Sequence, residues 1–164
     1  MQDLTAARLR ELLLYDPLTG EWTWLQTRGR NVPEGSRAGA DRGGYRYIQV
    51  DGNHYASSRI AFLFMTGKFP ADFVDHKNLN RSDDRWENLR EATKAENGAN
   101  RPLNRNSSSG FKGVSWDKGC NKWSAKIGFG GRKHHLGVFD APEDAYAAYL
   151  LAAQKRHGQF ARAS

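Results

Sequence analysis

Cysteine and long apolar runs are what this chain of 164 residues has least of. Its single cysteine, Cys120, excludes an internal disulfide and any zinc site built from several thiolates. No apolar run is long enough to cross a membrane and no signal peptide is recognisable, so we expect a cytoplasmic protein without a membrane partner. Hydrophobic residues make up 38% and charged residues 26% of the chain, and the length admits one or two small globular domains.

Acidic residues are scarce only in the C-terminal part. The formal charge is +7, yet residues 1–100 carry 14 Lys and Arg against 14 Asp and Glu. Residues 101–164 carry 11 against 4, so the whole excess lies there. A basic footprint confined to one region predicts a bound polyanion, and a merely solvated basic face is the alternative.

Residues 74–101 hold the side chains best suited to catalysis. A short apolar run leads into Asp75 and His76, which suits the end of a strand. A polar loop then covers residues 77–87, and residues 89–93 return as a second short strand. The expected order is strand, loop, strand and helix.

The helix is expected directly after the second strand. Thr93 and Glu96 have the spacing of a capping box, so Asn97 would lie in the first helical turn and face back toward the strands. Asp75 and Asn97 offer a carboxylate and an amide oxygen, hard ligands of the kind that Mg²⁺ or Mn²⁺ accepts. His76 would point to the other side of the strand, where it can take a proton from an attacking water.

The spacing of these residues resembles that of the HNH, or His-Me finger, endonucleases of phages and mobile introns. Asn88 follows His76 by 12 positions and Asn97 follows Asn88 by 9, within the segments DHKN, RSDDRWENLREAT and AENGANR. The resemblance implies a ββα-metal fold with His76 as the general base and Asn88 as the residue that ties the loop to the motif. It also implies that Asp75 and Asn97 hold one divalent cation, Mg²⁺ or Mn²⁺. A surface Asp-His pair beside Asn-rich turns is disfavoured, because three spacings and a capping box agree.

Two positions depart from the family's pattern. Leu79 stands where the family commonly has Gly, and Asp84 stands where it often has Asn. Both lie in the predicted loop, so we expect them to bear on loop geometry more than on chemistry.

The segment before the motif predicts its scaffold. Leu9, Leu12 and Leu13 share one face of an N-terminal helix, and residues 21–25 form a strand. Residues 26–44 are expected to form a loop, because they are rich in Gly and Arg and poor in apolar residues. Four arginines of this loop either touch phosphates or carry solvated charge: Arg28, Arg30, Arg37 and Arg42.

A hairpin and a helix are expected between that loop and the motif. Strands 45–50 and 54–56 flank an Asp-Gly-Asn turn. Ser57 or Ser58 would then cap a short helix over residues 59–65.

A second module is expected beyond residues 101–110, which have the composition of a linker and carry Arg101 and Arg105 as possible DNA contacts. Three strands are predicted, over residues 111–116, 122–129 and 133–139. Asp140 and Glu143 would cap a helix over residues 142–157, whose small residues let it lie close on one face of the sheet. The opposite face is left free for DNA, because the major groove admits β-ribbons as well as helices.

This module resembles the APETALA2, or ethylene-response-factor, type of DNA-binding domain through the segments GFKGVSW, KWSAKI, HHLGVFDAPEDAYAAY and HGQFA. Four residues fall where that family contacts DNA: Lys112, Lys126, Lys133 and His135. Three others stand where plant members have Arg, so base preference does not carry over: Ser115, Asp117 and Gly128.

Together these features predict an α+β protein with an HNH endonuclease domain and its scaffold at residues 1–100, a linker at 101–110 and a DNA-binding domain at 111–164. The fold would join a ββα-metal module to a three-stranded antiparallel sheet packed on one helix. The expected activity is metal-dependent hydrolysis of double-stranded DNA, of the homing type, with no small-molecule cofactor. One HNH site per chain favours a nick, and a phage-encoded chain would act in the host cytoplasm. A non-catalytic DNA-binding or regulatory protein on an HNH scaffold is the alternative, and an RNA-binding module is a weaker one.

Overall fold

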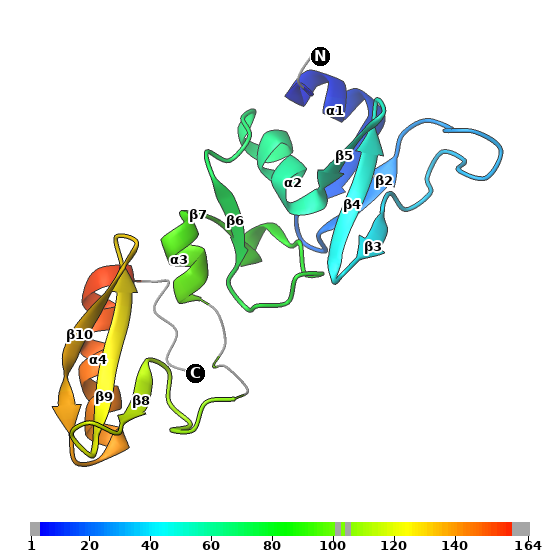
Figure 1. The fold of residues 1–164 in the computed structure, drawn as a ribbon. Helices are drawn as coiled ribbons and strands as arrows, with labels where there is room; N and C mark the ends of the chain where they lie inside the picture. Colours follow the sequence, from blue (N-terminus) through cyan, green and yellow to red (C-terminus); the bar gives the residue numbers. More distant parts are fainter. Residues whose placement is uncertain (1–3, 101–102, 104–105, 159–164) are drawn as a thin grey trace. The chain divides into compact units, whose positions relative to one another are not determined.

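The computed structural model describes residues 4–100, 103 and 106–158, which form two compact units (Figure 1). Unit 1 extends to Glu91, and unit 2 begins at Ala92. Both units combine helices with strands, so the fold is a mixed one, as the sequence predicts. Within the described ranges, no helix is both long and apolar enough to cross a membrane. The linker residues Arg101 and Arg105 lie outside the described residues.

Unit 1 contains three sheets in its described part, with strand orders β1-β2, β3-β4-β5 and β6-β7. Its elements are α1 (Ala6–Leu12), β1 (Leu13–Asp16), β2 (Glu21–Trp24), β3 (Ala40–Arg42), β4 (Tyr45–Val50), β5 (Asn53–Ala56), α2 (Ser57–Thr66), β6 (Phe73–His76), the 3₁₀ turn η1 (Trp86–Asn88) and β7 (Leu89–Ala92), whose last residue begins unit 2.

Helix α1 is shorter than the leucine pattern predicts. Leu13 lies in β1, where it pairs with Trp24 of the antiparallel strand β2. The strand geometry turns Leu13 and Tyr15 into the core, whereas Leu14 between them is 52% exposed. The pairing with β2 therefore decides a boundary that a local helical pattern cannot show.

The hairpin of β4 and β5 forms as predicted. Asp51 and Gly52 both have positive φ, at 46° and 83°, which is the backbone of a tight two-residue hairpin turn. Ile48 and Val50 alternate into the core of unit 1. Strand β3 pairs with the other side of β4, so part of the segment expected to be loop belongs to this sheet.

Helix α2 begins earlier than predicted. Its N-cap is Ala56, which makes no side-chain capping bond, so the prediction that Ser57 or Ser58 caps the helix is wrong. Both serines are buried in the first turn, and the Ser57 hydroxyl donates instead to the carboxylate of Asp84. Gly67 ends the helix in the left-handed conformation, with φ at 80°.

The N-terminal part of unit 1 holds the loop between β6 and β7 in place. The Trp86 amide donates to the carbonyl of Pro17 at 2.9 Å, and the Trp86 ring meets Phe62 of α2 edge-on at 4.8 Å. Gly20 approaches the backbone of Asp84 so closely that a Cβ there would lie 2.4 Å from the Asp84 carbonyl carbon. The segment before the motif is thus packed against it as a scaffold.

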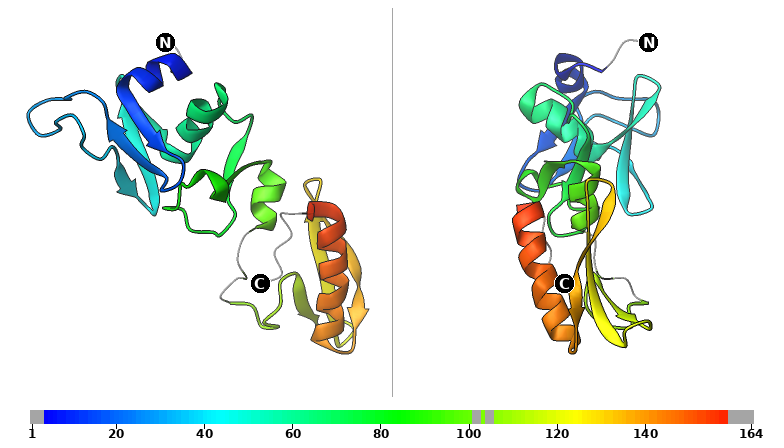
Figure 2. Two further views of the ribbon diagram at one scale, coloured as in Figure 1. Left: turned by 180° about the vertical axis from the view of Figure 1, so that it is seen from behind. Right: turned by 60° about the vertical axis from the view of Figure 1, so that its left-hand side comes forward.

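Unit 2 contains α3 (Lys94–Ala99), β8 (Val114–Asp117), β9 (Lys122–Phe129), β10 (Arg132–Phe139) and α4 (Pro142–His157). The strands form an antiparallel sheet in the order β10-β9-β8, and α4 covers one of its faces (Figure 2). The predicted capping box of Thr93 and Glu96 is present at the start of α3. At α4 the predicted cap is wrong: the N-cap is Ala141, and Asp140 pairs with Lys122 at 3.0 Å.

Candidate active site

Asp75 and His76 lie at the end of β6, and both are buried, with exposed fractions of 4% and 5%. Buried polar groups need partners, because losing water without a new hydrogen bond costs several kcal/mol. Neighbouring residues of a strand point to opposite sides, and these two side chains accordingly have different partners.

The imidazole of His76 is held by Asp84. Its Nε2 lies 2.9 Å from Asp84 Oδ1, and Asp84 is only 3% exposed. An ionised carboxylate only accepts hydrogen bonds, so Nε2 is the donor to Asp84 in this pair. The Ser57 hydroxyl donates to Asp84 Oδ2, so a second hydrogen bond fixes the carboxylate itself. These two hydrogen bonds hold the imidazole in a defined orientation.

Tyr15 secures the backbone behind this pair. Its hydroxyl donates to the main-chain carbonyl of Asp84 at 2.6 Å. Burial raises the pKa of the Tyr15 phenol, and the negative charge of Asp84 adds to the effect. The phenol is therefore a neutral donor across the physiological range.

Asn88 joins the two ends of the loop between β6 and β7. Its Oδ1 accepts from the Asn78 amide at 3.0 Å, and its Nδ2 donates to the Asp83 carbonyl at 2.7 Å. Its own carbonyl accepts from the Lys77 amide at 2.9 Å. Asn88 is 6% exposed, so these bonds are shielded from water. They are the contacts that a loop-fastening residue would make.

Asp83 and Leu79 shape the same loop. Asp83 accepts two hydrogen bonds from Arg85 at 2.8 Å each, and the Arg85 guanidinium lowers the pKa of the Asp83 carboxyl to about 2. Leu79 has φ at 65°, in the left-handed region that favours glycine. This backbone costs an ordinary side chain about 1 kcal/mol.

Asp75 is paired with Arg90 of β7. Arg90 Nε and Nη2 lie 2.8 and 2.7 Å from Asp75 Oδ2, and the side chains of Arg90 and Asp75 are 11% and 4% exposed. A carboxylate has about four lone-pair positions, so one group can serve both a guanidinium and a cation. As a hard anionic oxygen donor, Asp75 fits the predicted Mg²⁺ or Mn²⁺.

Asn97 lies in the first turn of α3, as predicted, and its amide donates to the Thr93 carbonyl at 2.9 Å. It belongs to unit 2, and its part in holding an ion stays a prediction. Among the described residues no cluster of three or more His, Cys, Asp and Glu is placed to hold a metal. The predicted ligand set is of another kind, one carboxylate and one amide.

Three of the predicted DNA contacts of unit 2 lie on the sheet face that α4 does not cover. His135 is the cross-strand neighbour of Lys126, and Lys133 that of Gly128, whereas Ala125 turns to the other face and is fully buried. Lys112, Lys126 and Lys133 also line one hollow of about 450 Å³. The sheet thus brings Lys126, Lys133 and His135 together on one face, and Lys112 lies at a hollow that two of them also line.

Three residues missed at the level of sequence belong to these sites. Asp84 is a departure from the family pattern that was expected to affect loop geometry, yet it contacts the candidate base directly. Arg90 gives no signal beyond its place in the ENLR segment. Arg132, one position before a predicted strand, lines a larger hollow of about 610 Å³ together with Lys126 and Lys133.

Comparison with known proteins points to one kind of enzyme. The profile of a family described as HNH endonuclease matches residues 55–99. Protein 3.8 of Escherichia phage T7 is 33% identical over 91 residues, which are 55% of this chain and 74% of the relative. An uncharacterized HNH endonuclease of Acanthamoeba polyphaga mimivirus is 33% identical over 103 residues, 62% of this chain and 52% of the relative.

Proposed function

The chain belongs to the HNH endonuclease family, and we propose that it is a metal-dependent endonuclease of the homing type that nicks double-stranded DNA. The observation that carries the proposal is the buried pair of His76 and Asp84, set inside the matched segment and backed by Ser57. A general base must be held within reach of the water that it deprotonates, and this pair fixes the ring of His76. In this proposal β6, β7 and α3 form the ββα-metal module of the family.

His76 acts as the general base. Its unprotonated nitrogen takes a proton from a water molecule, and the water oxygen forms a bond to the phosphorus atom of the DNA. The bond from phosphorus to the 3′ oxygen breaks, and this oxygen takes a proton from solvent water, leaving a 5′ phosphate and a 3′ hydroxyl. Asp84 stabilises the imidazolium that forms, because its negative charge lies 2.9 Å from the ring.

Asp75 and Asn97 would hold one Mg²⁺ or Mn²⁺. Such an ion supplies charge stabilisation for the phosphate and for the leaving oxygen. Asn88 keeps the loop between β6 and β7 closed around the site through its bonds to Asn78 and Asp83.

Unit 2 acts as a DNA-docking domain of the APETALA2-like type. Lys126, Lys133 and His135 share one sheet face, and Lys112 lies beside them at the same hollow. The entire positive excess of the chain lies in residues 101–164, and it includes Arg101 and Arg105 of the linker as further proposed DNA contacts. Removing Lys126 and Lys133 together should weaken duplex binding. The slope of the logarithm of affinity against that of salt should fall by about two, as expected for two lost phosphate contacts.

The decisive experiment incubates supercoiled plasmid with the full chain in Mg²⁺, in Mn²⁺ and in EDTA. We expect metal-dependent open circles, at least a hundredfold slower for His76→Ala, with DNA binding retained. His134→Ala is the matched control, because it removes an exposed histidine of the sheet in unit 2. Cleavage by His76→Ala at the normal rate, or cleavage in EDTA, would refute the proposed mechanism. Linear product from a single encounter would refute nicking.

One observation favours a second candidate, a DNA-binding protein that retains the scaffold without the activity. Arg90 places a positive charge against Asp75, the residue proposed to hold the cation. Plasmid that is shifted on a gel but stays intact under every divalent ion would favour this candidate.

A further inference from the structure

The three-stranded sheet of unit 1 has an outer face that the core does not use. Ile48 and Val50 of β4 point inward and are fully buried. Tyr45, Tyr47 and Gln49 alternate with them and point outward, half-buried or exposed. The outer face therefore presents aromatic and hydrogen-bonding groups.

The centre of this face is hollow. Tyr47 has Ala40 on one side and Ala56 on the other, so small side chains leave room around its ring. A hollow of about 340 Å³ lies there, and its lining includes two arginines and three other polar side chains: Arg28, Arg42, Tyr47, Gln49 and His54. Phosphate-binding and base-binding groups thus surround one concave surface.

The structure also separates the arginines of this region by what they contact. Arg37 pairs with Glu21 at 2.9 Å, and Arg46 donates to two main-chain carbonyls. The guanidinium of Arg28 lies 4.6 Å from the centre of the Trp24 ring. In the described part of unit 1 no acidic side chain pairs with Arg28 or Arg42, and both line the hollow.

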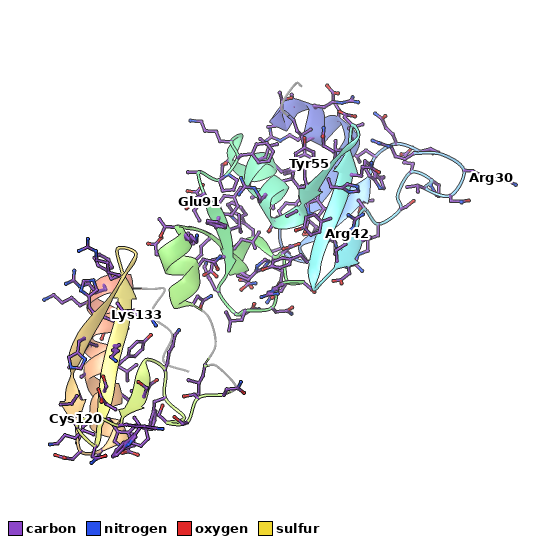
Figure 3. The ribbon with its side chains drawn as sticks, viewed as in Figure 1. Arg30, Arg42, Tyr55, Glu91, Cys120 and Lys133 are labelled. Atoms are coloured by element: carbon purple, nitrogen blue, oxygen red, sulfur yellow. The ribbon has the colours of Figure 1, made fainter. Side chains whose placement is uncertain are left out.

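Figure 3 shows how two arginines of this region differ in position. Arg42 lies at the sheet, on β3, whereas Arg30 lies at the far end of the loop that joins β2 to β3. Asp41, the acidic neighbour on β3, is the register partner of Arg46, whose side of β4 is opposite to that of Tyr47. The face is therefore basic although residues 1–100 carry no net charge.

The face is continuous with the candidate active site. The Tyr45 ring lies 6.1 Å from the His76 ring, and the Arg81 guanidinium covers Tyr45 at 4.9 Å. The Ser82 hydroxyl donates to the Gly44 carbonyl at 3.0 Å, so the turn before β4 touches the motif loop. All these residues belong to unit 1, so the juxtaposition is internal to that unit.

We propose that this outer face binds duplex DNA on one side of the cleaved phosphate, with Arg28 and Arg42 contacting backbone phosphates. From Tyr45 to Gln49 the strand rises roughly 14 Å, at about 3.4 Å per residue. That length corresponds to about four base pairs of B-form DNA. Unit 1 then has its own DNA contacts in addition to those of unit 2. This inference rests on the proposed function and adds a location for part of its substrate.

The test measures duplex binding by the full chain at several salt concentrations. Arg28→Ala/Arg42→Ala should lose about tenfold in affinity, and the slope of the logarithm of affinity against that of salt should fall by about two. Arg37→Ala is the matched control, since it removes a loop arginine that is already paired with Glu21. Arg28→Lys/Arg42→Lys keeps both charges and should restore the slope, which separates a lost contact from a lost fold.

A hydroxyl-radical footprint locates the contact. The parent chain should protect about four base pairs on one side of the nick, and the double alanine variant should lose that protection while keeping the region protected by unit 2. An unchanged slope and footprint in the double alanine variant would overturn the inference.

The two levels of the hypothesis fail differently. Intact plasmid together with a lowered slope in the double alanine variant would overturn the nuclease activity and leave the contact established. Normal cleavage with an unchanged slope would overturn the contact and leave the nuclease established.

Discussion

Replacing Asp84 tests whether the buried pair organises the site. In Asp84→Ala both His76 Nε2 and the Ser57 hydroxyl lose their acceptor, and both groups are buried. A hydrogen bond to a charged group contributes about 1.5 to 3 kcal/mol, so two of them amount to about 3 to 6 kcal/mol. This is a large part of the stability of a small domain.

Asp84→Asn separates geometry from charge. Its amide oxygen can still accept from His76, and its NH₂ group can donate to the Ser57 oxygen, so we expect a loss of only about 1 kcal/mol. We expect cleavage to fall about tenfold in this variant, because the imidazolium loses its counter-charge, and at least a hundredfold in Asp84→Ala.

Urea unfolding and plasmid nicking measure the two effects, at a temperature where both variants remain folded. Asp72→Ala serves as control, because Asp72 is exposed and should change stability by less than about 0.5 kcal/mol. DNA binding should be equal in all folded variants. The reasoning fails if the free energy of unfolding of Asp84→Ala lies within about 1 kcal/mol of that of the parent, the scale of one hydrogen bond, and if this variant nicks at the same rate.

Three further changes probe the same region. Arg90→Leu removes the guanidinium that pairs with the buried Asp75 and should lower the free energy of unfolding by about 3 kcal/mol. Mg²⁺ should restore part of this loss in a thermal melt, and a melting temperature that does not respond to the ion would contradict the prediction. The Asp83 carboxyl has a pKa of about 2 beside Arg85, below the ordinary 3.8, so its pairing stabilises the fold above about pH 4 and is lost as pH falls toward 2. The free energy of unfolding of Asp83→Asn should therefore fall less than that of the parent chain as pH falls through that window. Equal pH dependence of the two free energies would count against the pairing. Leu79→Asn should be more stable than Leu79→Val by about 1 kcal/mol in urea unfolding, because Asn adopts positive φ more readily than a β-branched residue; equal stabilities would rule out the strain.

Features that depend on neighbouring residues follow from the sequence. The capping box of Thr93 and Glu96 and the tight hairpin turn at Asp51 form where they are expected. The C-terminal strands and helix lie within a few residues of their predicted bounds. In each case the partners are close in the chain, so local geometry decides the structure.

The same local patterns mislead where a distant partner competes. The leucine pattern extends the first helix through Leu13, but pairing with β2 turns that residue into a strand. Ser57 has the form of a helix cap, but Asp84, 27 residues away, takes its hydroxyl. Asp140 is likewise drawn to Lys122 instead of capping α4.

The sequence by itself determined which residues are candidates for the site: the spacing of Asp75, His76 and Asn88 depends only on the lengths of the strands and the loop, which can be counted along the chain. Only the tertiary structure decided how those residues are held. It buries Asp84 against the candidate base and Arg90 against the candidate metal ligand, and it leaves some loop arginines available while pairing others. These contacts join residues of different segments of the chain, so local patterns do not reveal them. Burial strengthens each of the hydrogen bonds and ion pairs.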